Sequence, residues 1–192
     1  MTDHDGAYHR LFSQPDFVIE LLRDIIRPPW LSTLDLTTLE RVNIKLHGEG
    51  LKAKGPLRRE GDMLWRVKRK DGQDVYLFLL LEFQSTDDPW MPVRLIVYIG
   101  HVYEHLIQEG LLSRGRLPPI FPIVLYNGRA PWRTPTSLGA LIDLPEGSPL
   151  RDFQPNLRYY LIDQRRYSME ALKAMEAVIP MIIRLESCDD GL

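Results

Sequence analysis

The sequence predicts an α/β fold built on a mixed sheet, and three observations support this class. An Asp-Gly pair in Lys70-Asp71-Gly72-Gln73 separates two apolar runs, which is a strong signal for a β-hairpin. The second run, residues 75–81, is almost entirely apolar and is typical of a central strand covered on both faces. Helical patterns on either side complete the order helix, three strands, helix, two strands, helix.

The first half of the chain is expected to form one helix and three strands. The helix is capped by Asp16 and runs to about Arg27, where Pro28-Pro29 stops it. The strands are expected at 37–46, 62–69 and 75–84.

In the second half, Asp88 is expected to cap a helix that has Pro89 in its first turn, covers about 89–109 and ends at Gly110. The apolar residues expected to face the sheet are Met91, Leu95, Val97, Tyr98, Val102 and Leu106. Strands at 120–126 and 157–162 follow, and then a helix over 169–186.

Composition excludes several classes of protein. The 192 residues suit one domain, and the balance of 44% hydrophobic to 26% charged residues does not indicate disorder. Cys188 is the only cysteine, which excludes an internal disulfide framework and a cysteine-based zinc site. The polar start lacks the pattern of a secretory signal, and the apolar runs are too short to cross a bilayer. We therefore expect a cytoplasmic protein without a membrane partner.

Two acids flank the expected hairpin, and its register decides whether they meet. With a three-residue loop at 71–73, Asp62 lies directly opposite Glu82, with Cβ atoms about 5 Å apart. A two-residue loop places Asp62 opposite Leu81 instead. Gln84 shares the face of Glu82, because alternate strand residues point the same way. The first register predicts a site for one hard cation, whereas the plain alternative is two acids at strand ends in solvent.

Positive charge is concentrated around the first of these acids. Residues 51–70 contain eight bases and two acids, a net charge of +6 in a chain of net charge −2. Such a window suits a phosphate-backbone partner, and Arg58 and Arg59 are its central pair. The alternative is a solvated hairpin whose basic residues protect a sheet edge.

Short blocks of residues between position 4 and about 165 carry a resemblance to a known family. The blocks are His4-Asp5-Gly6-Ala7-Tyr8-His9-Arg10-Leu11-Phe12, Gly61-Asp62-Met63-Leu64-Trp65, Leu80-Leu81-Glu82-Phe83-Gln84-Ser85, Pro89-Trp90-Met91-Pro92-Val93-Arg94-Leu95 with Tyr98, and Pro122-Ile123-Val124-Leu125-Tyr126-Asn127-Gly128 with Pro131-Trp132. In this order and spacing the chain resembles the Rpn/YhgA-like recombination-promoting nucleases, also described as transposase-like. The resemblance implies one nuclease-like domain over 1–192 with a PD-(D/E)xK restriction-endonuclease-like core, a central mixed sheet flanked by helices in the order αβββαββα.

The resemblance also implies a mechanism. Asp62 and Glu82 would ligate Mg²⁺, joined by the Phe83 carbonyl and waters, and Gln84 would position the attacking water. Glu20 is a further candidate ligand. Arg66 and Arg94 would supply positive charge and, with Arg58 and Arg59, contact DNA.

The chain departs from the family pattern at two residues and in its length. His9 stands where many members have Lys, and Phe83 where many have His. Gln84 replaces the superfamily's Lys, as is common in this family, and brings no positive charge. Many members also continue well past the position of residue 192.

The expected function is a metal-dependent DNA endonuclease that hydrolyses phosphodiester bonds in recombination or transposition. The alternative is a catalytically inactive nucleic-acid-binding or oligomerisation module that keeps the nuclease fold. A third interpretation, a scaffold without a nucleic-acid role, suits the net acidity but not the basic window. Whether the chain forms a homo-oligomer is left open.

Overall fold

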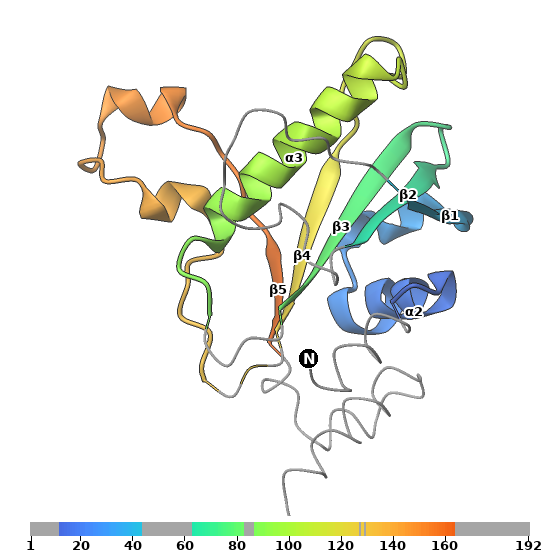
Figure 1. Ribbon diagram of the computed structural model, residues 1–192, viewed down its shortest axis with the longest axis horizontal. Coiled ribbons are helices and arrows are strands. Elements are labelled where there is room, and N and C mark those ends of the chain that lie inside the picture. Colours follow the sequence, from blue (N-terminus) through green and yellow to red (C-terminus); the bar gives the residue numbers. More distant parts are fainter. Residues whose placement is uncertain (1–11, 44–62, 83–86, 127, 129, 164–192) are drawn as a thin grey trace, which may run out of the picture.

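A five-stranded mixed sheet forms the centre of the protein (Figure 1). The computed structural model describes residues 12–43, 63–82, 87–126, 128 and 130–163. The strands are β1 (Leu34–Val42), β2 (Met63–Arg69), β3 (Asp74–Glu82), β4 (Ile120–Tyr126) and β5 (Tyr160–Asp163), and their spatial order follows the chain. The pairs β1–β2 and β2–β3 are antiparallel, whereas β3–β4 and β4–β5 are parallel. The mixed-sheet α/β class is therefore confirmed, while the helix expected at 169–186 lies outside the described residues.

The central strand β3 is buried on both faces, as its apolar run predicts. Val75, Leu77 and Leu79 belong to one hydrophobic cluster, and the residues between them belong to another. The second cluster contains Tyr76, Phe78 and Leu80 from this strand. Because successive side chains point to opposite faces, β3 joins two cores.

The N-terminal helix covers the face of Val75, Leu77 and Leu79. Helix α2 (Pro15–Glu20) continues as a π-helical turn (Leu21–Ile26). Its buried residues are Val18, Leu21, Leu22, Ile25 and Ile26, all in the first cluster. The expectation that Asp16 caps this helix is wrong. Gln14 takes that position without a side-chain bond, because Pro15, whose fixed φ suits a first helical position, starts the helix two residues earlier.

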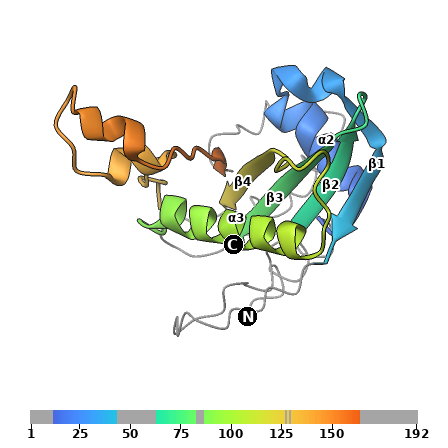
Figure 2. The ribbon, with the colours of Figure 1, turned by 90° about the horizontal axis from the view of Figure 1, so that it is seen from above.

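Helix α3 (Met91–Gln108) covers the opposite face, as Figure 2 shows. Its buried residues include Met91, Leu95, Tyr98, Val102 and Leu106, which recur at helical spacing. Val97 is 37% exposed and not part of this stripe, because it lies off the i, i+4, i+7 positions of the buried residues. Gly110, at φ 66°, ends the helix as expected, in the left-handed conformation that glycine adopts without strain.

The β2–β3 hairpin forms, but with a register that differs from both expected ones. Lys68 pairs with Asp74 and Met63 with Leu79, so the ladder is offset by two residues from the one that sets Asp62 opposite Glu82. The loop is 70–72, closed by the Arg69 N–H, which donates to the Gln73 carbonyl at 2.7 Å. Three-residue loops place a left-handed residue last, and Gly72, at φ 83°, takes that place. An offset of two leaves every side chain on its predicted face.

The remaining strands differ from their predicted bounds only at the ends. Strand β1 starts at Leu34, three residues before the predicted 37–46, and residues 44–46 lie outside the described part of the chain. Strand β5 occupies Tyr160–Asp163 within and just past the predicted 157–162. Before it, two 3₁₀ turns (Leu138–Leu141 and Pro149–Phe153) form an arm that extends away from the sheet (Figure 1).

Candidate active site at the carboxyl edge of the parallel strands

The predicted site residues are only partly within the described chain. Asp62, Gln84, Arg58 and Arg59 lie outside it. Glu82 is the last residue of β3, and its partner in the parallel ladder is Tyr126, the last residue of β4. The Glu82 position is thus at the carboxyl edge of the parallel strands, where α/β sheets commonly place their ligands.

A second acidic residue lies in line with the paired strand ends Glu82 and Tyr126. Tyr126 pairs in turn with Asp163, the last residue of β5. Neighbouring strands are about 4.8 Å apart, so the backbones at Glu82 and Asp163 lie about 10 Å from each other, with Tyr126 between them. In-register partners share a face, and Tyr126 belongs to the cluster under α3. Tyr126 and Asp163 therefore lie on the α3 face of the sheet.

Asp163 is a candidate residue that the sequence reasoning missed. It is only 2% exposed, and charged side chains are rarely buried so completely. The signal was present, because Asp163 directly follows the apolar run Tyr160-Leu161-Ile162. The same observation, an acid ending an apolar strand, had singled out Glu82.

Two aromatic residues, Trp132 and Tyr159, form a rigid group beside Tyr126. Its ring meets Trp132 edge-on, with centroids 4.9 Å apart, and its hydroxyl donates to the Ala130 carbonyl at 2.8 Å. The Trp132 indole N–H is shared between the Thr134 carbonyl, at 2.9 Å, and the Tyr159 hydroxyl, at 3.1 Å. Burial raises the pKa of Tyr159, so its hydroxyl keeps its proton and donates to the Pro135 carbonyl.

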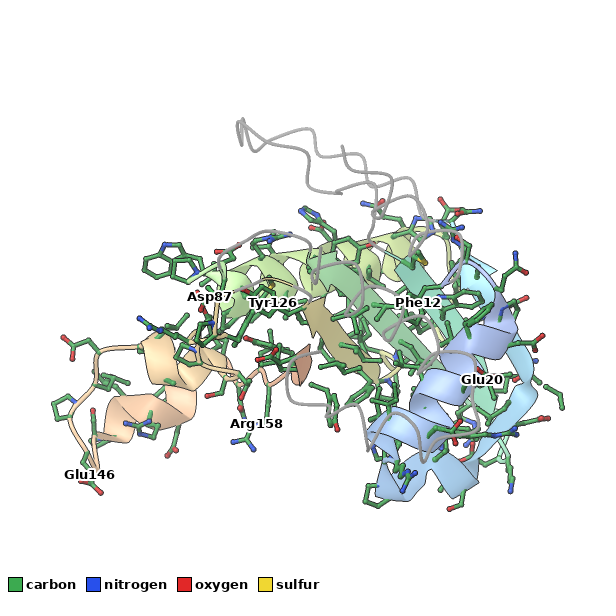
Figure 3. The ribbon with its side chains drawn as sticks, turned by 90° about the horizontal axis from the view of Figure 1, so that it is seen from below. Phe12, Glu20, Asp87, Tyr126, Glu146 and Arg158 are labelled. Carbon is green, nitrogen blue, oxygen red and sulfur yellow. The ribbon has the colours of Figure 1, made fainter. Side chains whose placement is uncertain are left out.

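Asp87, the first described residue after β3, forms hydrogen bonds to the loop between β4 and β5 that contains Trp132. One carboxylate oxygen, Oδ2, accepts from the Arg133 N–H at 2.8 Å, the Thr134 N–H at 2.6 Å and the Thr134 hydroxyl at 2.7 Å. Burial alone would raise the pKa of Asp87, but these hydrogen bonds favour the ionised form more strongly and lower the pKa. Asp87 therefore binds the loop as a carboxylate. Figure 3 shows it toward the same end of the sheet as Tyr126.

The expectation that Arg66 supplies positive charge beside Glu82 is contradicted. Arg66 pairs with Tyr76, six residues before Glu82 on β3, so their backbones are about 20 Å apart along the sheet. Its guanidinium binds the Glu40 carboxylate on β1, and this hydrogen bond raises the pKa of Arg66. The error arose from reading a shared strand face as proximity. A role of Arg66 in contacting DNA stays a prediction.

Arg94 and Glu20 lie on opposite sides of the sheet. The Arg94 guanidinium, in the first turn of α3, forms an ion pair with Asp88 at 2.9 Å. Asp88 also accepts from the Trp90 N–H, but the expectation that it caps the helix is wrong, because the helix begins at Met91 with Trp90 as its N-cap residue, and the proline in its first turn is Pro92. Glu20 lies on α2, which covers the other face, and Figure 3 shows it well apart from Tyr126. Its Oε2 is buried and has no hydrogen-bond partner among the described residues. The structure thus places Glu20 on the side of the sheet opposite to Tyr126.

The described residues also bear on the expected metal and membrane properties. In the described ranges, no three His, Cys, Asp or Glu side chains gather to form a metal site. Because Asp62 lies outside those ranges, this does not test the pair Asp62 and Glu82. None of the helices in the described part is both long and apolar enough to cross a bilayer.

These features define an α/β protein with acidic residues at the carboxyl edge of its parallel strands, and comparison with known proteins supplies the family. The model of the family "Putative transposase, YhgA-like" matches residues 2–187, so the chain belongs to this family, as its motifs predict. No solved structure matches the chain, and the PD-(D/E)xK core is therefore not confirmed by a structural neighbour.

Two curated relatives come from Escherichia coli. The recombination-promoting nuclease RpnD of strain O157:H7 is 28% identical over 163 residues, which cover 84% of this chain and 58% of the relative. The chain thus spans less than two thirds of the length of RpnD. The second relative, from strain K12, is named "Putative inactive recombination-promoting nuclease-like protein YjiP" and is 28% identical over 97 residues, 50% of this chain and 88% of the relative.

Proposed function

We propose that this protein is a Mg²⁺-dependent DNA endonuclease of the PD-(D/E)xK type that acts in recombination or transposition. The observation that carries the proposal is the position of Glu82, which ends the central buried strand at the carboxyl edge of the parallel ladder. Gln84 follows two residues later in the sequence. The relative RpnD, which is named a recombination-promoting nuclease, supports the same chemistry.

The observed register is compatible with a shared cation. Extending the β2–β3 ladder by one pair beyond Met63 and Leu79 would place Asp62 opposite Leu80 and diagonal to Glu82. Diagonal neighbours on one face have Cβ atoms about 7–8 Å apart, and two carboxylates at that spacing can reach one ion between them. The proposed pair thus does not need the direct opposition that the sequence suggested.

The donor set fits a hard cation. Asp62 and Glu82 would hold Mg²⁺ through carboxylate oxygens, the ligand type that this ion prefers. When bound, the ion would neutralise charge on the scissile phosphate and make a coordinated water more acidic. The amide of Gln84 would orient the attacking water by hydrogen bonding.

The inactive nucleic-acid-binding or oligomerisation module remains a second candidate. One observation favours it: Arg66 lies far from Glu82 and is ion-paired with Glu40, so it does not replace the charge of the superfamily's Lys. Arg94 is the other predicted source, and its ion pair with Asp88 places that charge near the start of α3. The relative named inactive, YjiP, is consistent with this alternative. The cytoplasmic location and any homo-oligomer stay predictions.

The test is nicking of supercoiled plasmid by the purified protein with and without Mg²⁺. Asp62→Asn and Glu82→Gln keep side-chain shape but each removes a charge from the proposed site. We expect both to lose at least about 100-fold in cleavage rate, equivalent to about 2.7 kcal/mol, and to bind Mg²⁺ more weakly. Gln84→Ala should reduce turnover but retain Mg²⁺ binding, and Gln84→Lys should retain or raise activity.

Asp35→Asn is the matched control, because Asp35 lies on β1 at the hairpin end of the sheet. It should cleave like the parent protein. A parent protein that binds DNA but never nicks it would favour the inactive module. Cleavage by Asp62→Asn at the parent rate would exclude this residue from the site.

A further inference from the structure

We propose that the exposed face of α3 is an interface through which two copies of this chain associate with their α3 helices antiparallel. This association is independent of the proposed nuclease activity. Five large apolar side chains lie exposed along one line of the helix and at its two ends. These residues, which we call the outer stripe, are Trp90, Val93, Val97, Ile107 and Leu111.

The outer stripe repeats at intervals of three and four residues. Val93 follows Trp90 by three residues, and Val97 follows Val93 by four. Single exposed apolar residues are ordinary on protein surfaces, but an alternation of three and four is the spacing by which one helix packs against another. The same spacing continues to Ile107 and Leu111, with Gly100 and Glu104 at the two positions between. The pattern therefore indicates a partner that also presents a helix.

The outer stripe lies on the side of α3 that faces away from the sheet. Val93 and Val97 are each two residues from the buried Leu95, which places them about 200° round the helix from it. Trp90 is 61% exposed and Ile107 is 55% exposed. Leu111 is held at the helix end by its N–H, which donates to the Leu106 carbonyl at 2.9 Å. No described helix or strand covers this side of α3, as Figure 2 shows.

The two halves of the outer stripe match each other when one copy is turned end to end. Trp90, Val93 and Val97 precede Gly100, whereas Ile107 and Leu111 follow it. In an antiparallel pair centred near Gly100, Val93 meets Ile107 of the second copy, and Trp90 meets Leu111 of the second copy. Two-fold symmetry repeats each contact, so the stripe is complementary to itself, as the interface of a symmetric dimer must be.

The charges at the two ends of α3 favour the antiparallel arrangement. Residues 87–94, which include Asp87, Asp88 and Arg94, carry a net charge of −1, and residues 109–116 carry +1. Arg114 and Arg116 in the second segment are exposed. An antiparallel pair brings the acidic end of each copy to the basic end of the other and also opposes the helix dipoles.

A parallel pair would be unfavourable for the same reason. It would align each end of α3 with the same end of the second copy. It would also align Glu104, which is exposed, with its own equivalent. Like charges facing each other across an interface disfavour association, so the charge pattern selects the antiparallel pair.

One helix from each copy makes a small interface. Residues 90–111 span about 30 Å at about 1.5 Å per residue, and only one side of that length is in contact. Interfaces below the standard size belong to weak or transient complexes, so we expect a dimer that forms in the micromolar range and dissociates on dilution.

The experiment is sedimentation velocity of the full chain between about 1 and about 200 µM, a range that brackets micromolar association. Val97→Glu and Ile107→Glu each place a charge in the outer stripe. Leu150→Glu is the matched control, because Leu150 is 58% exposed but lies on the arm. Circular dichroism of dilute samples reports the fold of every variant.

We expect the parent protein to dimerise reversibly, and Val97→Glu and Ile107→Glu each to weaken association by at least about tenfold. Leu150→Glu should associate like the parent. Reversing Arg114 and Arg116 together to Glu should weaken association at low salt and less so at high salt, because salt screens exposed charges. In dilute solution the two stripe variants should keep the spectrum and melting temperature of the parent, because both positions are exposed in a single copy.

Chemical cross-linking tests the direction of the two helices. In a Cys188→Ser background, Val93→Cys and Ile107→Cys are prepared as separate proteins and treated with a short bismaleimide, alone and mixed. The antiparallel pair places these two positions together across the axis. The mixture should therefore give a cross-linked dimer that contains one copy of each protein, and either protein alone should give much less.

Several results would overturn the interface. A parent protein that remains monomeric at the highest concentration excludes it. A dimer that survives both stripe variants, or that Leu150→Glu weakens equally, uses another surface. Stripe variants that lower the melting temperature of a monomeric parent would show that another segment of the same chain covers the stripe. Cross-linking of each cysteine protein with itself, but not in the mixed pair, would exclude the antiparallel arrangement.

Discussion

Asp87 shows how one carboxylate can connect two loops that are far apart in the sequence. Its environment contains opposing effects: burial disfavours the charge, whereas three N–H and O–H donors favour it. The donors prevail, so the pKa of Asp87 lies below its ordinary value. Ionisation of this group and formation of the loop contact are therefore linked.

This linkage predicts how the contribution of Asp87 to stability changes with pH. An unfolded Asp has a pKa near 3.9, and the pKa of folded Asp87 is lower, so around and below pH 4 the folded protein binds fewer protons than the unfolded chain does. The stabilisation by Asp87 is fully present above that range and is lost as the pH falls through the lower folded pKa. Urea unfolding of the parent and Asp87→Asn at pH 7 and pH 3 measures this. At pH 7 the parent should have a higher free energy of unfolding than Asp87→Asn, and this difference between the two proteins should be smaller at pH 3. If the difference is the same at both pH values, the ionisation of Asp87 is not what stabilises the folded protein.

At the scale of elements, the hairpin and α3 each contain a glycine, but only the glycine of the hairpin has a backbone conformation that other residues rarely adopt. Gly72 has φ 83° in the β2–β3 turn, a conformation that other residues rarely adopt, whereas Gly100 lies on the exposed side of α3. An added Cβ meets no atom within 4 Å at either position. The two positions therefore differ in backbone conformation and not in space.

Alanine at these two positions should change stability in opposite directions. Gly72→Ala should lower the free energy of unfolding by about 1 kcal/mol, because a left-handed conformation is strained for L-residues. Gly100→Ala should raise it by about 0.5–1 kcal/mol, because alanine favours the helix. Chemical denaturation of both variants checks this. If both variants change the free energy of unfolding by the same amount, the turn does not require a positive φ.

For the whole molecule, the uneven charge distribution bears on the proposed DNA partner. A net charge of −2 does not favour DNA binding, yet residues 51–70 carry +6. Part of this charge is already engaged within the protein, because Arg66 binds Glu40 and Arg69 binds Asp71. Arg58 and Arg59 lie outside the described residues and remain the strongest predicted phosphate contacts.

DNA affinity should consequently fall steeply with salt through counterion release. Replacing Arg58 and Arg59 together by Glu should weaken binding to unrelated sequences about equally and reduce the salt slope by about 2. Arg23 and Arg116, both exposed and outside the basic window, provide a control pair for the same reversal. Binding measured by fluorescence anisotropy between 50 and 200 mM salt, about the range over which phosphate contacts are lost, gives the slopes. Slopes that do not respond to Arg58 and Arg59 would mean that this cluster faces solvent.

Local patterns were sufficient to predict the elements and their faces. The unbroken apolar run 75–81 predicted a strand buried on both sides, and the Asp-Gly pair predicted the hairpin beside it. Helical spacing identified the buried stripe of α3 apart from Val97. These predictions succeed because period, turn chemistry and helix stops are properties of neighbouring residues.

The sequence by itself therefore determined the α/β class, the order of the elements within the described residues and the acid at the end of β3. The tertiary structure decided the hairpin register, the distance of Arg66 from Glu82 and the alignment of Asp163 with Tyr126. It also decided the contact between Asp87 and Thr134, 47 residues apart. The physical reason is that pairings between distant segments depend on how the faces of the sheet pack and how the loops close. No pattern within a single segment carries that information.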